Sequence, residues 1–113
     1  MEEKTMNLAK QVRTVELDGD EYILTLDVKA INHFKVTSKK QFLQSVPKFL
    51  VLDDEVVFYM LGSMLRKDEK SEPVGRKFLE QFNPFLIVEK LWPVAHDVIT
   101  GNLPKANGDS EKK

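Results

Sequence analysis

The pattern of apolar and polar positions divides the chain into an N-terminal pair of strands and a longer helical part. Residues 12–17 and 22–27 are rich in β-branched and aromatic side chains that alternate with polar ones, a pattern typical of half-buried strands. Gly19 lies between them and can adopt the positive φ of a tight turn. We therefore expect a β-hairpin whose apolar face consists of Val15, Leu17, Tyr22, Leu24 and Leu26.

The strongest helical signal covers residues 54–66. Asp53 or Asp54 can cap its first turn, and Arg66 with Lys67 suits the negative end of the helix dipole. Apolar residues surround most of its circumference, so other elements must cover it on nearly every side. This segment is predicted to be the central helix of the domain.

Two shorter helices are expected between the hairpin and the central helix, at residues 28–36 and 39–46. Thr37 and Ser38 are expected to cap the second, and Pro47 to end or kink it. The apolar face of this helix pair is predicted from Ala30, Ile31, Phe34, Phe42, Leu43 and Val46.

The last helix has a clear beginning, because Asn83 can cap it and Pro84 fits the first helical position. We expect it to run to about Thr100, with Gly101 just past its end, and to kink at Pro93. Its buried stripe is predicted to be Phe85, Val88, Trp92, Ala95 and Ile99.

The remaining segments complete an α+β, mostly helical fold in which an N-terminal β-hairpin precedes about five helices. Residues 67–73 are polar and predict an exposed loop, and residues 74–82 predict one more short helix. We expect a single domain at residues 11–103, a flexible N-terminus at residues 1–10 and a disordered tail at residues 104–113, whose composition is too polar to offset its ordering entropy.

Charge and composition exclude several classes of function. The chain has 17 basic and 18 acidic side chains and a net charge of −1, so the electrostatic attraction that supports nucleic-acid binding is weak. It has no cysteine, which fits a reducing cytoplasm. Its first residues are charged and its apolar runs are short, so we expect neither a secretory signal nor a membrane span.

No residue pattern points to catalysis, a cofactor or a metal. The acidic run Asp53, Asp54 and Glu55 is explained by a helix start. His33 and His96 lack the spacing of zinc ligands, and no serine or glycine motif of a hydrolase or a phosphate-binding loop is present. We therefore expect a non-enzymatic protein.

Partner contacts are expected on the central helix. Gly62 and Ser63 lie inside it, and a glycine there costs about 1 kcal/mol relative to alanine. These small residues either allow close helix packing or form a groove for a partner helix, and the sequence leaves both open. The positions predicted to reach a partner are Phe58, Tyr59 and Met64.

The order of elements resembles a known family. A strand pair at residues 15–22 is followed by residues 27–35, a Thr/Ser-Lys step with a Phe-Leu helix, an acid-started helix that ends Met64-Leu65-Arg66, and a final helical region. This order is similar to the small tail assembly chaperones of long-tailed bacteriophages and prophages, over residues 13–103. The resemblance implies a non-enzymatic, self-associating protein of the bacterial cytoplasm that binds the tape measure protein and keeps it soluble while the tail tube forms.

The alternative hypothesis is a small helical regulatory module that binds DNA or another protein. The helix pair at residues 28–50 could mimic a helix-turn-helix motif. Lys39, Lys40, Gln41 and Gln44 give its second helix only a few of the basic and amide side chains that a recognition helix presents. An enzyme ranks third.

Overall fold

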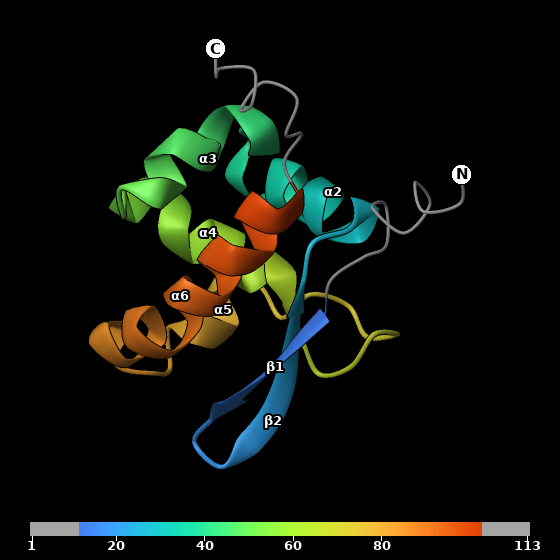
Figure 1. Ribbon diagram of the computed structural model, residues 1–113, viewed down its shortest axis with the longest axis vertical. Coiled ribbons are helices and arrows are strands. Elements are labelled where there is room, and N and C mark those ends of the chain that lie inside the picture. Colours follow the sequence, from blue (N-terminus) through green and yellow to red (C-terminus); the bar gives the residue numbers. More distant parts are fainter. Residues whose placement is uncertain (1–11, 103–113) are drawn as a thin grey trace.

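A computed structural model of the chain describes residues 12–102, so the expectations for residues 1–10 and 104–113 lie outside the described part. It has the expected α+β, mostly helical architecture, with an N-terminal hairpin followed by five helices (Figure 1). The elements are, in order, β1 (Val12–Leu17), β2 (Asp20–Thr25), α2 (Val28–Ser38), α3 (Phe42–Leu50), α4 (Asp54–Met64), β3 (Leu65–Arg66), α5 (Arg76–Leu79) and α6 (Pro84–Asn102).

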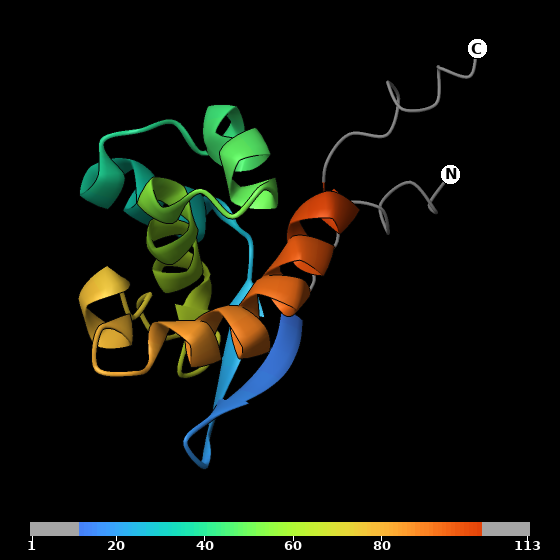
Figure 2. The ribbon, with the colours of Figure 1, turned by 90° about the vertical axis from the view of Figure 1, so that its left-hand side faces the viewer.

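The hairpin is confirmed, with a tighter turn than expected. Leu17 pairs with Asp20, and both turn residues have positive φ, 54° at Asp18 and 86° at Gly19, which suits the right-handed twist of the strands. Val15, Leu17, Tyr22 and Leu24 are buried as predicted. Helix α6 packs against β1 and β2 and covers the hairpin (Figure 2).

The central helix begins as predicted and ends earlier. The Asp53 carboxylate accepts a hydrogen bond from the Glu55 amide at 2.9 Å and caps α4. Helix α4 packs against α2, α3, α5 and α6, and also against β2. It is therefore the element around which the other helices are arranged.

The expectation that Arg66 ends this helix was wrong. Leu65 and Arg66 form β3, which pairs antiparallel with β2 through Leu24 and Ile23. The Arg66 side chain is buried and forms a bidentate ion pair with the Asp27 carboxylate, in which Nη1 lies 3.0 Å from Oδ2. Strand pairing and this buried pair replace the expected interaction with the helix dipole.

The helices between the hairpin and α4 also differ from expectation. Thr37 and Ser38 belong to the last turn of α2, where their hydroxyls donate to the carbonyls of His33 at 2.8 Å and Phe34 at 2.6 Å. They therefore do not cap α3, whose cap residue Gln41 makes no side-chain cap bond. Pro47 lies inside α3 without ending it, and Leu43 is exposed rather than buried.

The C-terminal part confirms the start of the last helix and corrects its buried face. The Asn83 carboxamide oxygen accepts a hydrogen bond from the Phe85 amide at 2.8 Å, as expected of a cap. Helix α5 is a single turn, and α6 continues through Gly101 to Asn102. The fully buried positions of α6 are Ile87, Leu91, Ala95, Val98 and Ile99.

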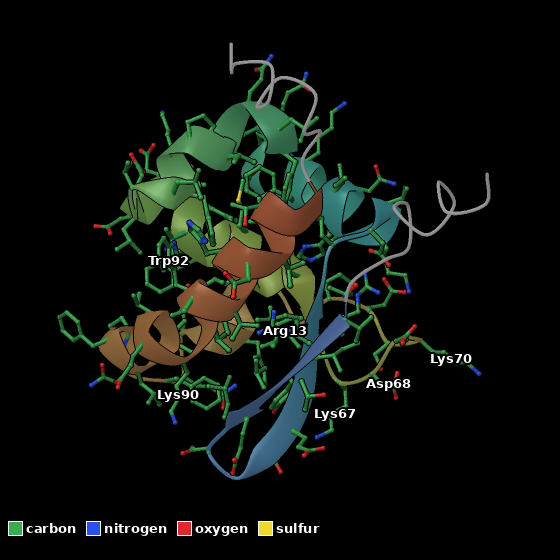
Figure 3. All side chains as sticks on the ribbon, viewed as in Figure 1. Arg13, Lys67, Asp68, Lys70, Lys90 and Trp92 are labelled. Carbon is green, nitrogen blue, oxygen red and sulfur yellow. The ribbon has the colours of Figure 1, made fainter. Side chains whose placement is uncertain are left out.

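Two further features of α6 concern its middle. Pro93 lies inside it, and Figure 2 shows the helix bending part-way along its length. Trp92, labelled in Figure 3, connects α6 to α3, because its indole Nε1 donates to the Phe49 carbonyl at 2.9 Å and its ring stacks on the Phe49 ring. No helix within residues 12–102 is both long enough and apolar enough to cross a membrane.

Candidate functional site

An apolar groove runs between the first half of α4, the short helix α5 and the start of α6. It consists of two adjoining hollows of about 230 and 560 Å³ that share Phe58, Arg76 and Pro84. The smaller hollow is also lined by Leu79, Glu80 and Phe82. The larger is also lined by Leu52, Asp54, Val57, Phe85, Val88 and Glu89. We call the two hollows together the α4–α6 groove.

The groove has a buried floor and an exposed apolar rim. Val57 and Leu79 form the floor and are 1% and 3% exposed. Phe58 is partly buried, whereas Phe85 is 82% exposed on the rim. The Asn83 cap and Pro84 fix the first turn of α6, and the buried stripe that begins at Ile87 then leaves Phe85 in solvent. A large aromatic ring so exposed beside an apolar hollow is typical of a contact surface.

The charged side chains that line the groove leave a net negative charge available to a partner. Arg76, the basic residue of the lining, is engaged by its own chain: Nη1 lies 2.8 Å from the Glu80 carboxylate, and the guanidinium lies over the Tyr59 ring at 5.2 Å from its centre. Asp54 and Glu89 are exposed and form no ion pair with any residue in the described range 12–102. Two free carboxylates therefore face solvent along the groove.

The three predicted partner contacts do not lie together. Phe58 lines the groove, and Tyr59 is partly buried beneath Arg76. Met64 is fully buried and does not reach the surface, because β3 draws the end of α4 toward the sheet. Contact of Phe58 and Tyr59 with a partner stays a prediction.

The small residues of α4 allow close packing and form no open groove. A Cβ atom at Gly62 would lie 2.5 Å from the carbonyl carbon of Gly75, and the Gly75 amide donates to the Gly62 carbonyl at 2.9 Å. Ser63 is buried and its hydroxyl donates to the Tyr59 carbonyl at 2.8 Å. That hydroxyl has only one proton, so His33 Nδ1, 2.9 Å away, is the donor in their contact.

The Ser63 contact gives the His33 side chain a structural partner. Burial lowers the pKa of its imidazole below 6.5, and the nearby Glu72 carboxylate opposes this shift in part. His96 packs against the Trp92 ring, with 5.0 Å between ring centres. Within residues 12–102 no three histidine, aspartate or glutamate side chains are grouped so that they could hold a metal ion.

Sequence reasoning missed the part of the groove that α6 contributes. Phe85 was expected in a buried stripe with Val88, Trp92, Ala95 and Ile99, but it is 82% exposed. A signal was available in the spacing of aliphatic residues, since Ile87, Leu91, Ala95 and Val98 form a complete helical stripe without Phe85.

No protein-family model, curated protein or solved structure matches the chain.

Proposed function

We propose that the protein is a non-enzymatic tail assembly chaperone of a long-tailed phage or prophage, acting in the cytoplasm of the bacterial host. In this role it self-associates and binds the tape measure protein, keeping that long chain soluble during tail assembly. The observation that carries the proposal is the α4–α6 groove, with Phe85 82% exposed on its rim.

The groove supports a binding role because the domain leaves apolar surface uncovered there. Burying a phenylalanine side chain against a partner contributes roughly 1.5–3 kcal/mol, and Phe85 leaves most of that contribution unrealised in the isolated chain. A chaperone for an apolar client needs such a surface, whereas an enzyme needs converging reactive groups.

Self-association has a separate candidate surface on α2. Val28 and Val36 are 71% and 67% exposed on this helix, on the side away from its buried residues Ala30 and Phe34. No residue of α2 lines the groove. A sister subunit on α2 would therefore leave the groove free for the client.

The regulatory alternative has less support. Lys39 and Lys40 lie in the bend between α2 and α3 rather than on a helix, so α3 presents few side chains suited to reading DNA. Salt-dependent binding to duplex DNA would favour this alternative, and its absence would remove the DNA-binding form of it.

The proposed function is tested by light scattering and by co-expression with the tape measure protein of the same phage or prophage. We expect a particle heavier than one chain, and we expect the tape measure protein to move from the pellet to the supernatant and to co-purify with the chaperone. A strictly monomeric protein that leaves its client insoluble would contradict the proposal.

A further inference from the structure

We propose that the occupant of the α4–α6 groove is an amphipathic helix of another protein, with basic residues on both sides of its apolar stripe. This inference deepens the proposed function and rests on it only for the identity of the protein that supplies the helix. It follows from the elements that line the groove, from its two adjoining hollows and from its charge.

The lining elements favour a helix over an extended peptide. Side chains of α4, α5, α6 and the adjoining turns line the groove, and neither β1 nor β2 contributes to it. An extended peptide obtains its affinity from an open strand edge, and without one its amide and carbonyl groups would be buried unpaired. A helix satisfies these groups internally, so it can enter an apolar groove without that penalty.

The two hollows match the way in which a helix is recognised. They meet at Phe58 and Pro84, and each has its own deeply buried floor residue, Leu79 in the smaller and Val57 in the larger. Helices that dock in grooves insert apolar anchors from successive turns, at positions such as i and i+3 or i+4. Each hollow thus receives one anchor, while Phe85 covers the side of the docked helix.

The charge selects a basic helix and disfavours a second copy of the same face. Asp54 and Glu89 line the groove and form no ion pair with residues 12–102, while Arg76 is engaged by Glu80 and Tyr59. A two-fold dimer through the groove would place the same patch on both subunits and so bring these carboxylates toward one another. Lysine or arginine residues that flank an apolar stripe are complementary to them instead.

Two fluorescent helical peptides test the proposal. Both are 18-residue peptides with the same leucine stripe; lysines flank the stripe in one and glutamates in the other. Fluorescence anisotropy with the full chain should show that the lysine peptide binds at least tenfold more tightly. Equal affinity for the two peptides would overturn the charge argument and with it the proposal.

Three variants locate the binding. Phe85→Ser should weaken the lysine peptide at least tenfold, and the double variant Asp54→Asn/Glu89→Gln should weaken it about threefold to tenfold and flatten its dependence on salt. Leu43→Ser is the matched control, because Leu43 is also exposed, at 65%, but lies on α3 outside the groove. Unchanged binding in Phe85→Ser, or an equal loss in Leu43→Ser, would overturn the proposal.

A final measurement separates this inference from the proposed function. If Phe85→Ser abolishes self-association without a client present, the groove binds a second copy and the inference is wrong. If Phe85→Ser still keeps the tape measure protein soluble as the unaltered chain does, the inference fails while the proposed function stands. If the unaltered chain binds the lysine peptide through the groove but leaves the tape measure protein insoluble, the inference stands and the proposed function fails.

Discussion

The two halves of α4 meet different surroundings. Other segments of the same chain cover its C-terminal half. The Gly75 backbone packs against Gly62, and His33 contacts Ser63. The residues that follow the helix pair with β2. Its N-terminal half borders the α4–α6 groove, where Phe58 is only partly buried. Apolar density along a helix therefore does not tell which half is core and which half is surface.

The two halves of α4 differ in which later segments of the chain pack against them. Residues after β3 return across the C-terminal half and hydrogen-bond to it, with Val74 donating to Leu65 at 2.9 Å and Gly75 donating to Gly62 at 2.9 Å. Beside the N-terminal half, the groove is bordered by α5, which is a single helical turn, and by the start of α6. These elements do not close over it, and Phe58 stays partly exposed.

The largest expected loss of stability comes from a substitution at the covered C-terminal end of α4, where Arg66 follows the helix. Arg66→Ala removes the buried guanidinium and breaks its ion pair with Asp27, so we expect a loss of about 3–5 kcal/mol in the free energy of unfolding. Urea denaturation followed by circular dichroism measures it.

Arg13→Ala is the control for this experiment. Arg13 Nη1 lies 3.9 Å from Asp97 Oδ2, and both side chains are exposed. This change should therefore lower the free energy of unfolding by less than about 1 kcal/mol. Equal losses of stability in the two variants would show that the buried Asp27–Arg66 ion pair contributes no more than an exposed one.

A smaller effect is expected where α4 meets the Gly75 segment. Gly62→Ala places a methyl group 2.5 Å from backbone atoms that cannot rotate away, and overpacking of this kind costs about 1–3 kcal/mol. The same denaturation measurement applies. Gly101→Ala, at an exposed position near the end of α6, is the control and should be neutral or slightly stabilising. A tolerated Gly62→Ala would mean that the contact is loose and the two halves of α4 are alike.

The smallest effect concerns pH. Burial lowers the pKa of His33 in the folded chain, so the unfolded chain binds a proton more readily. The free energy of unfolding should therefore fall as pH drops from about 6.5 toward the lower pKa of the folded state, because protonating the partly buried imidazole beside Ser63 is unfavourable.

Denaturant midpoints measured between pH 7.5 and pH 5 give this dependence. His33→Gln should reduce it, and His96→Gln should keep it. An equal dependence in the unaltered chain and in His33→Gln would contradict the assignment to His33.

The sequence predicts the parts of the fold that local chemistry determines. The positive φ of the glycine turn and the Asn83-Pro84 start depend only on near neighbours and were predicted correctly, and Asp53 is one of the two caps that were expected for α4. The end of α4 was not, because Leu65 and Arg66 leave the helix for partners on β2 and at Asp27, which are distant in the sequence.

The residues expected at the candidate site were also predicted only in part. Phe58 was named from the apolar excess of α4 and does line the groove. Met64 was named by the same argument and is buried, because a distant strand pairing pulls it inward. Phe85 was assigned to the core and is exposed. The face that α6 buries is determined by the hairpin against which the helix packs. The rotation of a helix about its axis thus depends on tertiary contacts that periodicity does not specify.

The Asp27–Arg66 contact also bears on the order of folding. It joins positions 39 apart and closes a loop that contains α2, α3 and α4. The β1–β2 hairpin needs only its own turn and can form within microseconds, whereas β3 can dock only after three helices have brought residue 66 back to the sheet. We therefore expect the sheet to be completed late in folding, after the hairpin has formed.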